Sequence, residues 1–218
     1  MASRGLLLDF GGVLTSSLYG RMAEFCVAAG LPADAIATAL GTPEGLIVAA
    51  LAEAGLAPQR DFEVMLARQL GLPSEGLIAR LLALDAFTPR PETADLARRA
   101  RAAGIPTGLL SNSWGDGGYD VYTGHDLAAL FDVVVISHLV GLRKPERPIF
   151  ELAAAKLGVT AADCVLVDDT WANVAAAREL GMTGVHYTGE PEQLTEVERL
   201  LGLTSSGSLE SLPGGAGG

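Results

Sequence analysis

The sequence contains little positive charge. Its 218 residues include 15 lysines and arginines against 26 acidic residues, which gives a formal net charge of −11. Nucleic acids and anionic membrane surfaces attract basic patches, so this composition argues against either as a partner. The only lysines are Lys144 and Lys156. An anionic ligand therefore needs a local positive centre, such as a metal ion or one well-placed lysine.

Cysteines and long apolar runs are also scarce. Cys26 and Cys164 are the only cysteines, and both lie in apolar stretches, so we expect buried free thiols and no disulfide framework. No apolar stretch approaches the ~20 residues that cross a membrane, and the N-terminal leucine run is too short for a signal-peptide core. Because 49% of the residues are hydrophobic, we expect a packed, globular, cytoplasmic protein.

Five short apolar runs predict the strands of a buried parallel sheet, because they are continuous and do not alternate with polar residues. The runs cover residues 5–10, 105–110, 132–137, 164–168 and 184–187. Helical patterns between the later runs cover residues 92–103, 148–157 and 173–180. Glycine is typical just after a helix, and these three patterns are followed by Gly104, Gly158 and Gly181. The alternation predicts an α/β fold with a doubly wound, Rossmann-like parallel sheet.

The interval between the first two predicted strands has a different character. It contains no convincing strand, and its helical patterns cover residues 20–29, 43–54, 60–70 and 76–84. It is also longer than an ordinary connection. We therefore predict an inserted α-helical cap domain over residues 16–87 and a core domain over residues 1–15 and 88–203; the alternative is that these helices pack onto the sheet. Glycine and serine dominate residues 204–218, which predicts a disordered tail.

Polar residues stand at the ends of three predicted strands. Asp9 closes the first, Ser111 and Asn112 follow the second, and Asp168 and Asp169 stand at the end of the fourth. In an open parallel sheet the carboxyl ends of the strands share one edge, where ligands bind. Each residue alone also fits a turn or a helix cap. It is their combination that predicts a site.

Four segments in this order resemble the signature motifs of the haloacid dehalogenase-like superfamily. The first is Leu-Leu-Leu-Asp-Phe-Gly-Gly, whose Asp matches the family's nucleophile, and the third is Gly-Leu-Arg-Lys-Pro-Glu. The resemblance covers residues 9–173 and places the helical insertion where that family has its C1 cap. The matching residues are Asp9, Ser111, Lys144, and the group of Asp168, Asp169 and Asn173.

The resemblance implies a Mg²⁺-dependent phosphatase that acts on a small phosphorylated molecule. Asp9 would attack phosphorus and form an aspartyl-phosphate, which water then hydrolyses. Mg²⁺ prefers hard oxygen ligands; the family pattern assigns it the carboxylates of Asp9 and Asp169 and the backbone carbonyl of Gly11. Asp168 is expected to be an outer-shell partner or an alternative ligand, with Asn173 beside it.

The same pattern implies a cradle for the phosphoryl oxygens. Lys144 would offset the negative charge of the substrate and of the carboxylates. Ser111, Asn112 and nearby backbone N–H groups would donate hydrogen bonds. Gly11 and Gly12 would let the backbone approach the phosphoryl group, because glycine has no Cβ to clash with it.

The chain departs from the family pattern at Gly11. Phosphatases of this family usually carry a second Asp there, which protonates the leaving group and then activates water. Such acid–base catalysis contributes about 10²–10⁴-fold. The metal contact at this position is through the backbone and is spared. We therefore expect a substrate that needs little protonation, such as an anomeric sugar phosphate or an acyl phosphate.

Two alternatives stay open. A catalytically impaired member would bind metal and a phosphorylated ligand or act through a partner protein. The second alternative is a different reaction on the same scaffold, such as dehalogenation. Dehalogenating relatives, however, have lost the acidic pair that Asp168 and Asp169 retain. Phosphonate-cleaving relatives need a cap lysine for a Schiff base, and residues 16–87 contain none.

Several further residues are weaker candidates. His138 has a suitable pKa range to replace the missing acid–base, although its position favours a role in the loop or behind the site. Trp171 follows the acidic pair and fits either a substrate contact or packing. Asp116 lies in a glycine-rich loop after Ser111. Candidate contacts for an anionic substrate within the insertion are Arg21, Arg60, Arg68 and Arg80. The sequence does not indicate the oligomeric state.

Overall fold

The computed structural model describes residues 4–83, 87–115, 117 and 120–203. The predicted tail, residues 204–218, lies outside the described residues. A five-stranded parallel sheet has the order β3-β2-β1-β4-β5. Its strands are β1 (Gly5–Leu8), β2 (Thr107–Ser111), β3 (Val133–Ile136), β4 (Cys164–Asp168) and β5 (Thr183–His186). All five predicted strands are confirmed, with ends that shift by one or two residues.

The register of β1 fixes which residues meet at the carboxyl edge of the sheet. Leu8 pairs with Leu109 of β2 on one side and with Val167 of β4 on the other. The backbone N–H of Asp9 donates to the carbonyl of Val167 at 3.0 Å. Asp9 therefore lies beside Asp168, at the point where the strand order switches direction and ligands bind in such sheets.

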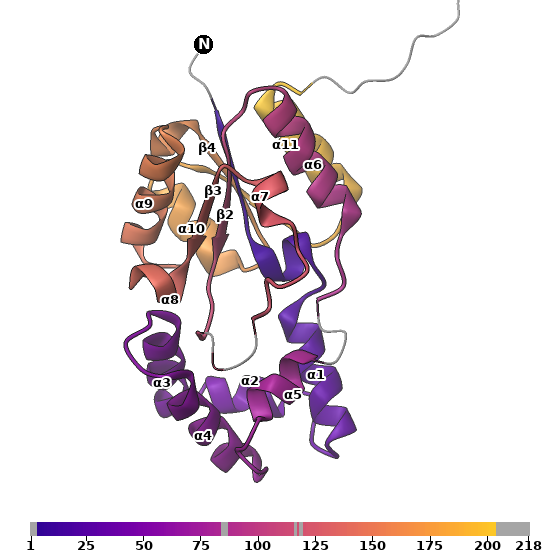
Figure 1. Cartoon of the computed structure of the whole chain (residues 1–218), viewed down its shortest axis with the longest axis vertical. Coiled ribbons are helices and arrows are strands. Elements are labelled where there is room, and N and C mark those ends of the chain that lie inside the picture. The colour runs from indigo at the N-terminus through magenta and orange to yellow at the C-terminus, as the bar shows by residue number, and fades with distance from the viewer. Residues whose placement is uncertain (1–3, 84–86, 116, 118–119, 204–218) are drawn as a thin grey trace, which may run out of the picture.

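Helices cover both faces of the sheet (Figure 1). On one face lie α6 (Pro91–Ala102) and α11 (Pro191–Leu201), and on the other lie α9 (Arg147–Leu157) and α10 (Trp171–Glu179). Short helices α7 (Leu127–Leu130) and α8 (Ser137–Val140) flank β3. Along β1, Leu6 and Leu8 pack into the first layer and Leu7 into the second. This two-sided burial explains the continuous apolar runs and confirms the doubly wound fold.

The helical insertion forms a layer of its own beyond the carboxyl edge of the sheet (Figure 1). Its helices are α1 (Leu18–Ala28), α2 (Ala35–Leu40), α3 (Pro43–Glu53), α4 (Gln59–Leu70) and α5 (Leu77–Ala83). They share a separate apolar core that includes Cys26, Phe62 and Leu66. The chain leaves and re-enters the sheet region side by side, since Thr15 and Pro89 form an antiparallel bridge. The inserted helical region is thus confirmed, while α2 and α11 were not predicted.

Two expectations from the composition concern the cysteines and the helices. Cys26 and Cys164 are both free and buried, as predicted. Burial raises the pKa of the Cys164 thiol to about 11. Within the part of the chain that the structure describes, no helix is both long enough and apolar enough to cross a bilayer.

The contact between α2 and α3 requires a glycine. Thr42 caps α3, because its Oγ1 accepts a hydrogen bond from the N–H of Gly45 at 3.0 Å. A Cβ at Gly45 would lie 2.9 Å from the Cα of Leu40 and would overlap the carbonyl of Ala39. Both neighbours are backbone, so they cannot move aside without separating the two helices.

Gly45→Ala should therefore destabilise the protein by about 1–3 kcal/mol, the usual cost of overpacking. Gly20→Ala is the matched control, because Gly20 lies in α1 with nothing within 4 Å of a built Cβ. The control should stabilise by about 0.4–1 kcal/mol through a less flexible unfolded chain. Denaturant unfolding measures both. Equal effects of the two substitutions would contradict the tight α2–α3 contact.

Candidate active site

Three carboxylates from distant parts of the chain meet at the carboxyl edge of the sheet. Asp9 follows β1, Asp168 ends β4 and Asp169 comes next. One oxygen from each lies within 4.8 Å of the others. The structure thus brings together the three acids that the sequence placed at strand ends.

Lys144 lies within this acidic group. Its Nζ is 2.9 Å from Oδ1 of Asp9 and 2.7 Å from Oδ2 of Asp168. The lysine side chain is only 1% exposed, although it comes from the loop between α8 and α9. Three negative charges thus face one positive charge. Lys144 is the positive partner of this buried group, and removing it would leave carboxylates without a counter-charge, which costs about 3–5 kcal/mol.

Asp168 uses its carboxylate to hold its neighbours in place. It is fully buried. Besides Lys144, its oxygens accept hydrogen bonds from the N–H of Thr170 at 2.9 Å and from Nδ2 of Asn173 at 3.0 and 3.1 Å. Both carboxylate oxygens of Asp168 are therefore engaged. This arrangement favours a role in orienting Lys144 over a role as a direct metal ligand.

Asp169 is held more loosely. Oγ1 of Thr170 donates to one oxygen at 3.3 Å and Oγ of Ser17 to the other at 3.5 Å. Its backbone carbonyl is 2.9 Å from Nε2 of His186. The main chain at Asp169 is therefore fixed, while its carboxylate has only long hydrogen bonds and retains capacity to bind a cation.

The electrostatics of the group follow from burial and crowding. Burial raises the pKa of Asp9 to about 7; Lys144 opposes this shift, and the charges of Asp168 and Asp169 add to it. Burial and Asp168 likewise raise the pKa of Asp169. For Lys144, burial lowers the pKa, but the charges of Asp168 and Asp9 outweigh burial and raise it. The lysine is thus charged at neutral pH, and the acids gain from any added positive charge.

A divalent cation fits this set of donors. Asp9 and Asp169 offer carboxylate oxygens in excess over the one lysine charge. Gly11, whose carbonyl is the third predicted ligand, lines the same cavity. Hard oxygen donors with space for waters are the ligands that Mg²⁺ prefers. A cation here would offset the burial and the mutual repulsion that raise the pKa values of Asp9 and Asp169.

The two glycines after Asp9 differ in what they allow. Gly12 has a φ of +78°, and a Cβ there would overlap the carboxylate of Asp169. Gly11 has φ −67° and ψ 132°, and a Cβ there would lie 4.0 Å from Leu18 and from Phe87. Gly12 is therefore required by geometry, whereas Gly11 has room for a side chain.

The predicted phosphate-binding pair after β2 has different surroundings. Ser111 is buried, and its Oγ accepts a hydrogen bond from the Tyr122 hydroxyl at 3.0 Å. Asn112 grips the backbone of Lys144: its Oδ1 accepts from the lysine N–H at 2.9 Å, and its Nδ2 donates to the lysine carbonyl at 3.0 Å. Asn112 thereby positions the lysine loop. Phosphate binding by either residue stays a prediction.

The insertion contributes Glu53, which the sequence analysis missed. Nε of Arg143 donates to its carboxylate at 2.7 Å and Nδ2 of Asn112 at 3.3 Å. Burial raises the pKa of Glu53, while Arg143 opposes the shift. A lone acid at the end of the otherwise apolar stretch of α3 was the available signal. This contact joins the insertion to the loop that carries Lys144.

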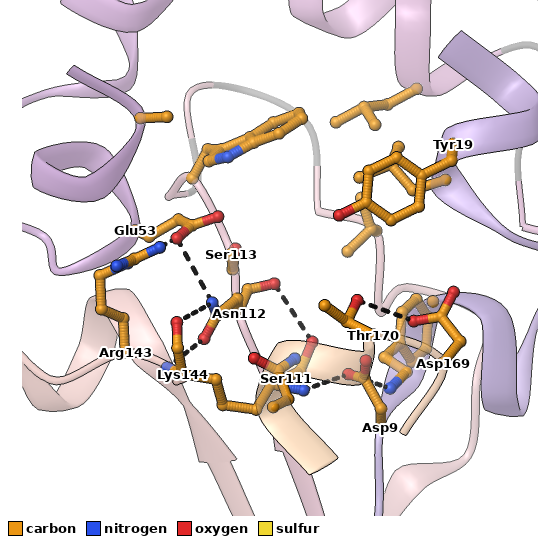
Figure 2. A pocket seen from close by; sticks show the side chains of 18 of the residues that line it. Asp9, Tyr19, Glu53, Ser111, Asn112, Ser113, Arg143, Lys144, Asp169 and Thr170 are labelled. Carbon is orange, nitrogen blue, oxygen red and sulfur yellow. Dashed lines mark hydrogen bonds and ion pairs between the residues drawn. The ribbon is translucent and has the colours of Figure 1, made fainter. Parts of the chain in front are cut away.

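A cavity of about 360 Å³ lies between the insertion and the edge of the sheet. Figure 2 shows Asp9, Asp169 and Lys144 on one side of it, and the Tyr19 hydroxyl directed into it over Thr170. Tyr19 was not singled out from the sequence. The cavity size is in the range of about 300–1,000 Å³ that small-molecule sites occupy.

Several weaker candidates lie elsewhere. Among the described lining residues, none of the four predicted arginines of the insertion appears, namely Arg21, Arg60, Arg68 and Arg80. Contact of these arginines with a substrate stays a prediction; Arg68, for example, pairs with Glu44. His138 does not line the cavity either, and its carbonyl faces Gly55. Trp171 is 56% exposed, and its ring meets the ring of His186 edge to face. Asp116 is outside the described residues.

The raised pKa of Asp9 predicts a pH-dependent stability effect. The metal-free folded state binds a proton at Asp9 more tightly than the unfolded chain, so this group destabilises the fold above pH 7 and does so less as the pH falls from about 7 to 4. Asp9→Asn should raise the unfolding midpoint at pH 8 by about 2–4 °C with chelator present. At pH 4–5 the gain should be small.

Asp95→Asn is the control, because Asp95 is an exposed acid of α6. It should change the midpoint little at either pH. Thermal melts of the three proteins at both pH values make the comparison. An unfolding midpoint of Asp9→Asn that is equal to or below that of the wild type at pH 8 would contradict the raised pKa of Asp9.

The two glycines predict opposite effects of alanine. Gly12→Ala should lower the free energy of unfolding by at least about 2 kcal/mol, because it adds a left-handed alanine and a clash with Asp169. Gly11→Ala should be neutral or stabilising by up to about 1 kcal/mol. Denaturant unfolding separates them, and a Gly11 variant as unstable as the Gly12 variant would disprove the assigned geometry.

Comparisons with known proteins agree with this architecture. The profile of the haloacid dehalogenase-like hydrolase family matches residues 4–181. Phosphatase MT3486 of Mycobacterium tuberculosis (strain CDC 1551 / Oshkosh) is 29% identical over 186 residues, which make up 84% of this chain and 86% of the relative. The sesquiterpene phosphatase astK of Aspergillus oryzae is 28% identical over 138 residues, 63% of this chain and 70% of the relative. Two longer relatives match over only 10% and 16% of their own length.

The fold also has close counterparts among solved structures. A HAD family enzyme of Bacteroides thetaiotaomicron, solved as a magnesium complex, has a TM-score of 0.64 to this chain at 21% identity. The match covers 88% of this chain and 96% of that one, and at this identity it concerns the fold. Since the family profile spans most of the chain and the strand order and insertion agree with it, the protein belongs to the haloacid dehalogenase-like hydrolase family.

Proposed function

We propose that the protein is a Mg²⁺-dependent phosphatase with Asp9 as its nucleophile and a small phosphorylated molecule as its substrate. The observation that best supports this proposal is the position of the buried Lys144. It contacts Asp9 and Asp168, and the loosely held Asp169 lines the same cavity. The two named relatives are phosphatases, which supports the same reaction. In this proposal residues 16–87 act as the cap over the site.

The reaction needs a nucleophile, a positive field and a way to release the alcohol. An oxygen of ionised Asp9 attacks phosphorus, the bond to the leaving oxygen breaks, and an aspartyl-phosphate results. A water oxygen then attacks that phosphorus, which restores the Asp9 carboxylate and releases phosphate. A bound Mg²⁺ would supply charge stabilisation for the phosphoryl oxygens.

The chain's own residues have separable roles in this scheme. Lys144 holds a positive charge beside Asp9, which keeps part of the nucleophile ionised despite burial. Asp168 and Asn112 position Lys144 from its side chain and its backbone. Asp9 and Asp169, with the carbonyl of Gly11, would hold the cation. Ser111 would donate a hydrogen bond to a phosphoryl oxygen.

Gly11 restricts the substrate. It offers no proton to the leaving group, so a leaving group that is stable as an anion reacts most readily. An acyl phosphate or an anomeric sugar phosphate meets this requirement. The space beside Gly11 is also large enough for a water or a substrate atom where other family members carry a carboxylate.

A catalytically impaired metal- or partner-binding protein is the alternative, and Gly11 is the observation that favours it. A dehalogenase is less well supported, because Asp168 and Asp169 keep the acidic pair. Turnover separates the first alternative from a phosphatase, and halide release separates the second.

Phosphate release from acetyl phosphate and a panel of phosphate esters tests the proposal. We expect release that requires Mg²⁺, stops with chelator, and is lost in Asp9→Asn by at least about 10³-fold, since the nucleophile is removed. The matched variant Asp95→Asn changes an exposed acid and should keep wild-type activity. No release from any substrate, or equal release by Asp9→Asn, would overturn the proposal.

The open space at Gly11 generates a second prediction. Gly11→Asp should increase turnover of alkyl phosphates by about 100-fold, the lower end of the contribution of general acid–base catalysis. Acetyl phosphate, whose leaving group needs no proton, should gain much less. Gly11→Asn is nearly isosteric but lacks the carboxylate and should give no gain. If Gly11→Asn increases turnover as much as Gly11→Asp, proton transfer is not the missing step.

A further inference from the structure

We infer that the leaving group of the substrate is uncharged and apolar, in the manner of an aryl or hydrocarbon group, and that the cap side of the cavity binds it. This inference rests on the proposed phosphatase function and narrows its substrate class. It follows from the division of the cavity into two unlike sides.

The side opposite the carboxylates is mostly apolar, although Tyr19, Glu53 and Gln59 of the insertion also line the cavity. The polar side holds Asp9, Lys144 and Asp169 with Ser111 and Thr170. The apolar lining residues on the other side come from α1, α2, α3 and α5, together with one residue each at positions 87, 114 and 121. They are Leu18, Met22, Leu40, Ala49, Leu82, Phe87, Trp114 and Val121.

This apolar side is continuous with the core of the cap. Met22 and Leu82 are members of the cap's buried cluster, and Trp114 and Val121 pack against it. The Trp114 ring lies 4.6 Å from the ring of Phe62, which is fully buried. The surface that faces the substrate is therefore held in place by the cap core and does not need to order on binding, which favours affinity for an apolar group.

The charges of the cavity disfavour a second anionic group on the substrate. Among the described lining residues the bases are Arg143 and Lys144. Arg143 is 2.7 Å from Glu53, and Lys144 is paired with Asp9 and Asp168. A carboxylate or second phosphate on the leaving group would meet Glu53 and find both cations already neutralised. Burying an unpaired charge is strongly unfavourable.

Polar partners for a polyhydroxylated leaving group are also few. Of the described lining residues from α1–α5, the uncharged polar ones are Tyr19 and Gln59. Each sugar hydroxyl that is buried without a hydrogen bond costs about 1–3 kcal/mol. An apolar leaving group has no such cost and gains from contact with the cap. The cavity thus favours an acidic apolar alcohol, phenol or enol over a sugar.

Substrates with leaving groups of similar acidity provide the test. The ratio kcat/KM would be measured for full-length protein with Mg²⁺ on phenyl, 2-naphthyl and 4-carboxyphenyl phosphate, and on acetyl phosphate as a reference. A larger apolar group should raise kcat/KM by about tenfold from phenyl to naphthyl, as added apolar contact does in other sites. The carboxylate should lower it by about tenfold or more relative to phenyl.

A matched pair of variants locates the contact. Val121→Thr replaces a methyl group on the apolar side with a hydroxyl of nearly the same size. It should lower the ratio of naphthyl to acetyl phosphate turnover by about fivefold or more, since the hydroxyl must be desolvated. Val64→Thr makes the same change on α4 at a position 47% exposed and outside the lining residues, and should leave the ratio unchanged. Because the readout is a ratio, a general loss of folded protein cancels.

The outcomes distinguish the two proposals. If neither acetyl phosphate nor any ester is hydrolysed, the proposed function fails and this inference fails with it. If phosphate is released but 4-carboxyphenyl phosphate reacts as well as the naphthyl ester, or Val121→Thr leaves the ratio unchanged, only the apolar leaving-group inference is overturned.

Discussion

The ion contacts of Lys144 are the interaction on which the rest of the site depends. The lysine reaches Asp9 at the end of β1 and Asp168 at the end of β4, so its position requires the β1–β4 register. Neither carboxylate would be acceptable in this buried place without the lysine charge, and the lysine would not be charged without them. Lys144 pairs with Asp9 and Asp168 and leaves the carboxylate of Asp169 without a lysine contact in the described structure. One register therefore places both Asp9, the proposed nucleophile, and Asp169, a carboxylate with capacity to bind a cation, at the same edge.

The insertion completes this arrangement from the opposite side. Glu53 contacts Arg143 and Asn112, which flank and grip the lysine loop. The position of α3 is thus linked by direct hydrogen bonds to the position of Lys144. Apolar residues of the insertion line the cavity above the carboxylates, and an apolar lining that excludes water strengthens electrostatic interactions. The same few contacts of Glu53 therefore join the insertion to the charged residues beneath it.

The sequence predicted the sheet, the insertion and the convergence of Asp9, Asp168 and Asp169 because these follow from local periodicity and from the shared edge of parallel strands. The six-residue α2 was missed since it is too short and alanine-rich for a clear period. Glu53 and Tyr19 were missed for another reason. Their positions depend on how the insertion docks on the core, and no spacing rule in a single sequence fixes that contact. The four candidate arginines of the insertion are absent from the described cavity lining for the same reason, because their charge gave no information about the direction in which their helices face.

The central claim is that Asp9 carries the phosphoryl group during turnover. Rapid acid quench of the protein with acetyl phosphate and Mg²⁺, followed by mass spectrometry of the peptides, tests it directly. The account predicts a phosphorylated peptide whose modification lies on Asp9, which is absent with chelator and absent in Asp9→Asn. Phosphate release with no adduct on Asp9, or an adduct on another residue that persists in Asp9→Asn, would contradict it.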